Sequence, residues 1–270
     1  MLRQLFKYEF RQTAKVMLSV YGILALVTLF GALMLNGLSS DSLFAGLTLF
    51  FYILTVVALM IVVYIYVGMR FYKTMYSDCG YLTHTLPVAP SATLNVKLIV
   101  SFVWMFGAVL LTLLSVFLLI HGMTHGQLIP ELFHALKNGS LAAELDEAFA
   151  VMGVSLGWSV GYFIGVMALS CLYYLLWLYA SASIGQLFSQ HKLAIAVIAA
   201  VLLYFINQIA NLILLLTTMG SFFRSMESNS YVMPLEMRPA LYGSVVLEAA
   251  FALIYYLITV RIVTRHLNLE

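Results

Sequence analysis

Charged side chains are scarce in this sequence. Lysine, arginine, aspartate and glutamate together make up 9% of the chain, whereas hydrophobic residues make up 63%. A soluble globular domain carries about 25% charged residues. A chain with so few charges could not hide its apolar side chains by folding in water. We therefore predict that lipid is its solvent and that it forms a single membrane domain.

Motifs for disulfides, nucleotide binding and catalysis are also missing. The two cysteines, Cys79 and Cys171, form no CxxC pair, so no disulfide framework is predicted. A P-loop needs a glycine followed by lysine, because backbone N–H groups and that lysine hold the phosphates of ATP. No such pair, HExxH motif or nucleophilic triad is recognisable. We expect no enzymatic activity, no directly bound cofactor, no resident metal and no nucleic-acid partner.

Long apolar runs, in contrast, are abundant. A helix that crosses the roughly 30 Å hydrocarbon core needs about 20 mostly apolar residues, and lipid offers its backbone no hydrogen-bond partners. The strands of membrane β-barrels alternate over about ten residues, whereas these runs are longer and uniformly apolar. We therefore predict an all-α membrane protein with six transmembrane helices, near residues 16–36, 44–69, 97–120, 149–182, 193–218 and 240–263.

Basic residues orient these spans, because cytoplasmic loops of membrane proteins are enriched in lysine and arginine. An even number of spans places both termini on one side. That side carries Arg3, Lys7, Arg11, Lys15, Arg70, Lys73, Lys97, Lys192, Arg261 and Arg265. The opposite side carries Lys137, Arg224 and Arg238. We predict cytoplasmic termini, a long cytoplasmic loop over residues 70–96 and an outer loop over residues 121–148.

The N-terminal segment 2–15 is amphipathic. Its basic residues recur every fourth position and form one stripe of Arg3, Lys7, Arg11 and Lys15. This pattern predicts a helix in the membrane interface, with its cations toward lipid headgroups. No A-x-A cleavage site follows, so we expect a retained first span. Glu9 projects into the apolar sector, where an unpaired carboxylate is costly. Its partner is either a cation on the same helix, or a cytoplasmic loop or partner protein.

The cytoplasmic loop contains a predicted short helix. Asp78 can cap a helix from Cys79 to Leu86, and Pro87 ends it, because the residue before a proline disfavours the α conformation. The helix would present aromatic and aliphatic side chains, including Tyr81, and few charges. Such a surface suits docking into a groove of another protein. The alternative is a plain connector that rests on the membrane.

Two stretches carry a resemblance. The chain opens with MLRQLFKYEFRQTAK, and its loop reads GYLTHTLPVAP before a lysine and the third span. Both resemble permeases of the type-2 ABC exporter class, in particular the small six-span permeases of the Firmicutes kind. The family has a basic K-Y-E-F/L opening and the cytoplasmic signature G-Y-L-x-x-T-L-P-V-x-P. The matching signature residues are Gly80, Tyr81, Leu82, Thr85, Leu86, Pro87, Val88, Pro90 and Lys97. Cys79 departs from the pattern, which has a small or acidic residue there.

The resemblance implies a role for each stretch. The short helix would be a coupling helix that sits in a cleft of a cytoplasmic ABC ATPase. The N-terminal segment would be the connecting helix beside it, with Glu9 holding the two together. The ATPase, a separate polypeptide, would bind ATP and Mg²⁺, and a second permease subunit, the same or related, would complete the transporter. The implied activity is outward transport of a hydrophobic or amphipathic peptide, antibiotic or lipid across the cell membrane.

Glycines recur every fourth residue in the predicted fourth span, at Gly153, Gly157, Gly161 and Gly165. Glycines at this spacing share one helix face and let another backbone approach closely. The face either packs against a helix, within the subunit or at a dimer seam, or lines a path that changes shape during transport.

Polar side chains cluster in the predicted fifth span, and one acid lies in the sixth. Asn207 and Asn211 share a face with Tyr204 just above them, and such side chains either hold helices together or contact substrate. Glu248 is the only acid within a span and is therefore a functional candidate. It either contacts a cationic or amide-bearing substrate or pairs with the fifth span. An ion-coupled secondary transporter that uses Glu248 as its coupling site is the alternative function.

Histidines on the outer side have a spacing that could hold a metal. His121 and His125 stand four apart, and Glu131 and His134 follow them. A glycine directly after each of the first two histidines makes a continuous helix unfavourable, which favours an ordinary interfacial loop.

Overall fold

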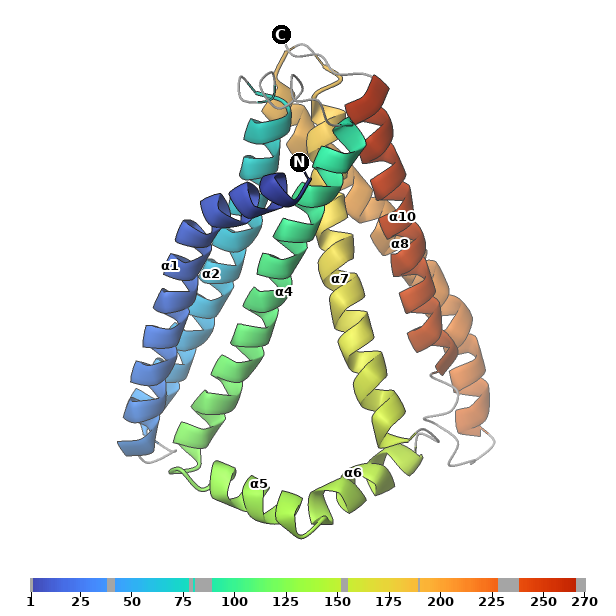
Figure 1. Cartoon of the computed structure of the whole chain (residues 1–270). Helices are drawn as coiled ribbons and strands as arrows, with labels where there is room; N and C mark the ends of the chain where they lie inside the picture. The colour runs from blue at the N-terminus through green and yellow to red at the C-terminus, as the bar shows by residue number, and fades with distance from the viewer. Residues whose placement is uncertain are drawn as a thin grey trace. The chain divides into compact units, whose positions relative to one another are not determined.

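The computed structural model describes residues 2–37, 42–77, 80, 89–151, 155–188, 190–227 and 238–265, and these residues form helices and turns without strands. The helices in these ranges are α1 (Leu2–Gly37), α2 (Leu43–Met75), α4 (Pro90–Met123), α5 (Leu128–Lys137), α6 (Ser140–Val151), α7 (Leu156–Gly185), α8 (Lys192–Glu227) and α10 (Arg238–Arg265) (Figure 1). All of them except α5 and α6 are long and apolar enough to cross a membrane. The predicted number of six spans is confirmed.

The boundaries correct several predictions. The connection predicted over 121–148 is largely helical, because α5 and α6 fill most of it, separated at Gly139, whose φ is +72°. The fourth span, predicted from residue 149, begins at Leu156 instead. The apolar residues at the end of α6 continue the apolar sequence of α7, so the two helices were predicted as one span. Helical structure also covers both ends of the predicted 70–96 loop, since α2 ends at Met75 and α4 begins at Pro90.

The chain forms two compact units. The first comprises residues 1–69 and 95–143, and therefore contains α1, α5 and most of α2 and α4. The second comprises residues 70–94 and 144–270, and contains α7, α8, α10 and most of α6.

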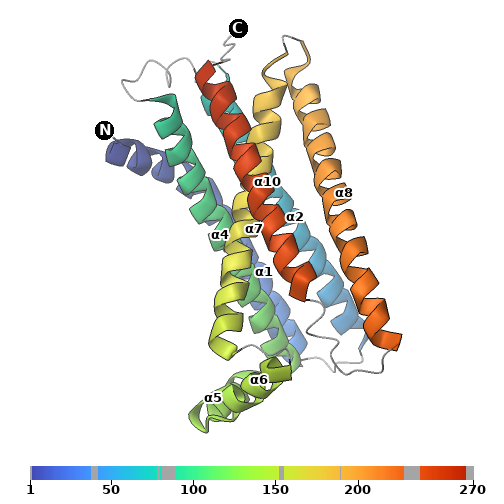
Figure 2. The same ribbon diagram turned by 90° about the vertical axis from the view of Figure 1, so that its right-hand side faces the viewer.

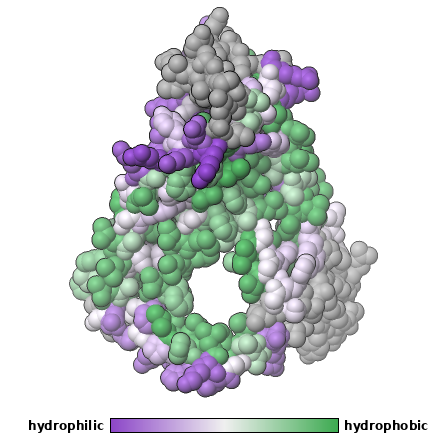
Figure 3. Space-filling model, in the orientation of Figure 1, coloured by the Kyte–Doolittle hydropathy of each residue, from purple (hydrophilic) through white to green (hydrophobic). Residues whose placement is uncertain are grey.

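Helix α1 of the first unit runs without interruption from Leu2 to Gly37, so the predicted interfacial segment and the first span are one helix. Its first turns lean away from the axis of the rest (Figure 1). The Thr13 hydroxyl donates to the backbone oxygens of Glu9 at 2.9 Å and Phe10 at 3.0 Å, a contact that commonly bends helices. These turns carry hydrophilic side chains, whereas the following part of α1 is hydrophobic (Figure 3).

Close backbone contact joins α1 and α4 in this unit. A methyl group added at Gly122 would lie 2.5 Å from the Ala32 oxygen, so only glycine fits there. A cluster of buried apolar residues lies nearby and includes Leu35 and Leu119. The Tyr52 hydroxyl of α2 hydrogen-bonds the Ser115 hydroxyl of α4 within this packing. The parts of these helices around Gly122 and Ser115 are therefore fixed by shape and by a buried polar contact.

The second unit is built on three neighbouring helices, α7, α8 and α10 (Figure 2). Trp177 of α7 donates its indole N–H to the Ala200 oxygen of α8 at 3.0 Å. Tyr255 of α10 donates its hydroxyl to the Leu203 oxygen of α8 at 3.2 Å. Both bonds use backbone oxygens of one stretch of α8, and they set the spacing of the three helices.

Candidate functional site

Polar side chains from these three helices line one cavity of about 240 Å³ in the second unit. Its lining consists of Tyr173, Tyr174, Tyr204, Asn207, Gln208, Asn211, Ser244 and Glu248. The cavity walls therefore offer a carboxyl group, phenols, amides and a hydroxyl. So many polar groups in the middle of apolar helices are expensive in lipid and point to a functional site.

Helical periodicity accounts for much of this lining. On α8 the polar positions are spaced by three, four and seven residues, which places on one face Tyr204, Asn207, Gln208 and Asn211. On α10, Ser244 and Glu248 are four residues apart and share a face in the same way. Glu248 follows the start of this span at Leu241 by about 10 Å along the helix axis, at a rise of 1.5 Å per residue.

Hydrogen bonds fix the amides of α8 within the cavity. The Asn211 amide nitrogen donates to the Asn207 backbone oxygen at 3.0 Å and to its side-chain oxygen at 3.3 Å. The Gln208 amide nitrogen donates to the Tyr204 hydroxyl at 2.6 Å. These contacts run along one helix, so they hold the side chains in place without closing the cavity against α7 or α10.

The Glu248 carboxyl is the one acidic group of the lining. It is half-buried, and the Ser170 side chain of α7 hydrogen-bonds it. Within the described ranges no lysine, arginine or histidine forms an ion pair with it. The carboxyl therefore faces aromatic rings and oxygen acceptors without a cationic partner from this part of the chain, and such surroundings attract a cation.

The structure thus brings together Glu248, Tyr204, Asn207 and Asn211, which the sequence singled out in two separate spans. Sequence reasoning missed Tyr173 and Tyr174, because an aromatic pair in an apolar helix looks like ordinary packing. It also missed Ser244, although its position one turn before Glu248 was a usable signal.

The glycine face of α7 has no neighbour in the described part of the chain. A methyl group added at Gly157, Gly161 or Gly165 would meet no atom within 4 Å, and all three residues are exposed. Packing of this face within the subunit, one of the sequence alternatives, is therefore not seen at these three positions. Gly153 lies outside the described residues.

A buried ion pair joins α1 to α4 in the first unit. Glu9 and Lys97, which are 6% and 5% exposed, form a salt bridge. This cation is not on the same helix as Glu9, because Lys97 belongs to α4. Next to the pair, Trp104 donates its indole N–H to the Thr13 hydroxyl at 2.8 Å. The Phe10 ring stacks on the Trp104 ring, with the ring centres 4.8 Å apart.

The predicted basic stripe lies on the outside of the same helix. Each of its members is exposed: Arg3, Lys7, Arg11 and Lys15. One side of the first turns of α1 thus packs on α4, and the other carries the cations.

Side-chain contacts with α7 hold the end of α2, where the predicted 70–96 loop begins. The Tyr76 hydroxyl donates to the Ser183 hydroxyl of α7 at 2.7 Å, and Phe71 stacks on Tyr179 with ring centres 3.7 Å apart. Burial raises the pKa of the Tyr76 phenol above its usual value. The Ser183 hydrogen bond acts in the opposite direction but is the smaller effect. The phenol therefore remains a proton donor at any physiological pH.

Most of the predicted coupling helix lies outside the described residues, namely Asp78, Tyr81, Leu82, Thr85, Leu86 and Pro87. Gly80 is described and is buried, and its N–H donates to the Ser77 oxygen at 2.5 Å.

Gln186, at the end of α7, is fully buried, and its amide has no hydrogen-bond partner among the described residues.

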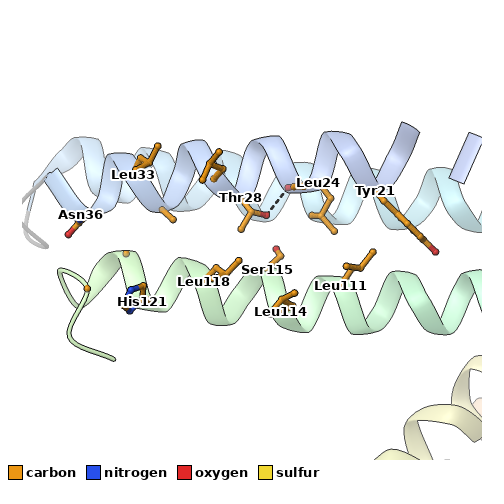
Figure 4. Close-up of a pocket in the computed structure, with 15 residues that line it drawn as sticks. Tyr21, Leu24, Thr28, Leu33, Asn36, Leu111, Leu114, Ser115, Leu118 and His121 are labelled. Atoms are coloured by element: carbon orange, nitrogen blue, oxygen red, sulfur yellow. Dashed lines mark hydrogen bonds between the residues drawn. The ribbon is translucent and has the colours of Figure 1, made fainter. Parts of the chain in front are cut away.

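A larger cavity, of about 560 Å³, lies between α1 and α4 in the first unit (Figure 4). Leucine is the commonest residue in its walls, and Thr28 and Ser115 face each other midway along it. The Thr28 hydroxyl is used within its own helix, donating to the Leu24 oxygen at 2.7 Å. Asn36 and His121 lie at one end of the cavity. The space therefore suits an apolar chain better than a charged molecule.

His121 and His125, whose spacing suggested a metal site, do not converge on one point. The His125 ring nitrogen Nδ1 lies 3.0 Å from the Asn36 backbone oxygen, whereas the His121 ring accepts the Ile129 N–H at 3.4 Å. His125 has a φ of 51°, which ends the helical path that the four-residue spacing would need. No group of three potential metal ligands occurs among the described residues.

Together, the six apolar helices define a multi-pass, all-helical membrane protein. No protein family, curated protein or solved structure matches this chain.

Proposed function

We propose that this chain is the membrane-spanning permease subunit of an ABC exporter, driven by an ATPase that is a separate polypeptide. One observation carries the proposal beyond the sequence resemblance. The segment that resembles a coupling helix is attached at both ends to buried polar contacts, Tyr76 with Ser183 before it and Lys97 with Glu9 after it.

These attachments are what a force-transmitting loop needs. A close-packed interior passes on a displacement, because its side chains have little free space to absorb it. Phe71 and Met75 before the loop are 2% and 0% exposed, and Thr93 and Leu94 after it are 2% and 1% exposed. A push on residues 78–88 would therefore reach α2 and α4 with little loss. An unanchored connector would bend instead.

The remaining parts of the proposal follow from the sequence. The chain has no P-loop, so ATP and Mg²⁺ would be bound by the partner ATPase. A second permease subunit, identical or related, would complete the transporter. The distribution of basic residues orients both termini toward the cytoplasm of a cell membrane. The leucine-lined cavity between α1 and α4 supports a hydrophobic or amphipathic cargo.

Site-specific photo-crosslinking in cells tests this function. A photoreactive amino acid at Leu82 should form an adduct with a protein that contains a P-loop. The matched control is the same amino acid at Phe133 of α5, which is 67% exposed and lies in the predicted outer loop. It should give no such adduct. Absence of an adduct at Leu82, or an equal adduct at Phe133, would contradict the proposal.

A second function is favoured by the cavity around Glu248. An intramembrane carboxylate in a polar cavity is the arrangement expected of an ion-coupled secondary transporter. That function requires no ATPase. Transport by the purified chain in vesicles, driven by an ion gradient without ATP, would replace the first proposal with this one.

A further inference from the structure

We propose that the cavity among α7, α8 and α10 binds the ammonium group of a cationic amphipathic compound. The inference deepens the proposed function and rests on it, because it names the chemical class of the cargo.

Charge is the first argument. Glu248 contributes a carboxyl within a span, and the described part of the chain provides no cation to pair with it. An isolated charge is costly in a low-dielectric setting, and the cost falls when an opposite charge enters. A bound ammonium would supply that charge. An anion, in contrast, would be repelled by the carboxylate.

The size and lining of the cavity distinguish an organic ammonium from a bare metal ion. The cavity holds about 240 Å³, whereas one water molecule occupies about 30 Å³ of liquid. A sodium or potassium ion would fill only a small part of it and would have to keep several water molecules there. Tyr173, Tyr174 and Tyr204 add aromatic rings, which attract organic cations through their faces. The amide oxygen of Asn207 has lone pairs for ammonium N–H donors.

The exposure of the lining residues indicates how a cargo would lie. Tyr173 is 4% exposed and forms a closed side of the cavity. Tyr174 and Tyr204 are 41% and 43% exposed and mark the open side. A cationic head group could therefore sit beside Glu248 while an apolar tail leaves past these two rings. This is the division of polar and apolar surface that an amphipathic cation has.

A binding experiment on the purified full chain, without ATP or ATPase, tests the inference. The probe is tritiated phenethylammonium, measured by scintillation proximity in an uncharged detergent. The competitors are 2-phenylethanol, which has the same shape without the charge, and sodium or potassium ions. We expect saturable binding that phenylethanol does not displace. Equal displacement by phenylethanol, or displacement by an alkali ion at the probe's own concentration, would overturn the ammonium assignment.

Variants locate the site. Glu248→Gln should weaken binding about tenfold or more, the range of a lost charge-assisted hydrogen bond. The matched control is Glu144→Gln, at an exposed acid on α6, which should leave binding unchanged. Ser244→Lys places a cation one turn from Glu248 and should abolish binding while the carboxyl is still present. Elution as a single peak in size exclusion shows that each variant is folded.

The outcomes separate this inference from the proposed function. Unchanged binding by both folded Glu248→Gln and folded Ser244→Lys would overturn the inference, even where an ATPase still crosslinks at Leu82. Normal ammonium binding without any crosslinked ATPase would leave the cavity assignment in place and reject the ABC permease.

Discussion

At the scale of single residues, a buried salt bridge joins Glu9 of α1 to Lys97 of α4. An acid among the apolar residues of an amphipathic segment could be recognised as needing a partner. The partner itself could not be identified, because Lys97 is separated by 88 positions and only tertiary packing brings it close. The spacing of polar and apolar residues along one helix does not reveal which face of another helix packs against it.

Removing one member of this pair should strongly destabilise the protein. Lys97→Met leaves the Glu9 carboxylate buried without its cation, and breaking such a pair typically costs about 3–5 kcal/mol. Glu9→Gln together with Lys97→Met removes both charges and should recover part of the loss. The measurement is the thermal unfolding midpoint in detergent.

Lys15→Met is the control for that experiment, since Lys15 is an exposed cation on the same helix. It should change the unfolding free energy by no more than about 0.5 kcal/mol. A Lys97→Met protein that unfolds at the wild-type temperature would show that the pair contributes nothing.

The candidate cavity was predictable only in part. The polar stripe of α8 and the acid of α10 are local signals, because helical spacing and a carboxyl in an apolar run are visible in one dimension. The contribution of α7 was not visible. Tyr173, Tyr174 and Ser170 resemble the other residues of an apolar helix until packing turns them toward Glu248.

At the scale of helices, the six spans could be predicted because each is a long uninterrupted apolar run. Helices α5 and α6 could not, because they mix polar and apolar residues, and α5 contains no buried residue that the sequence would mark. The boundary between α6 and α7 was misplaced because the last residues of α6 are apolar and continue the apolar sequence of α7. Helix α1 is the opposite case, in which a predicted boundary does not exist.

Glycine substitutions should separate tight helix contacts from open faces. Gly122→Ala places a methyl group against the Ala32 backbone and should destabilise the protein by about 1–3 kcal/mol. Gly22→Ala, on α1, meets no atom within 4 Å and should be neutral or stabilising by up to about 1 kcal/mol. Unfolding midpoints of the two variants provide the comparison. Equal midpoints would mean that α1 and α4 do not approach closely at Gly122.

At the scale of the whole molecule, composition alone defines a membrane protein, and the excess of lysine and arginine at one set of span ends predicts how it is inserted. The helices themselves have no preferred direction in a symmetric slab of hydrocarbon. Orientation therefore depends on a few exposed charges and is open to a direct test.

Thiol labelling should report this orientation. In a background of Cys79→Ser and Cys171→Ser, Asn138→Cys lies in the exposed turn between α5 and α6, and His191→Cys lies in the exposed turn before α8. A membrane-impermeant maleimide should label position 138 in intact cells, but position 191 only after permeabilisation. The reverse labelling pattern would place the termini outside the cytoplasm.

The unbroken course of α1 has a mechanical consequence. Its 36 residues extend for about 54 Å along the helix, well beyond the roughly 30 Å of a hydrocarbon core. Near one end it is bonded to α4 through Glu9, and near the other its backbone touches Gly122. A break in the helix would let the cationic turns move alone. Because α1 is bent but unbroken and contacts α4 near both ends, a displacement of those turns is passed along the helix to the region of Gly122.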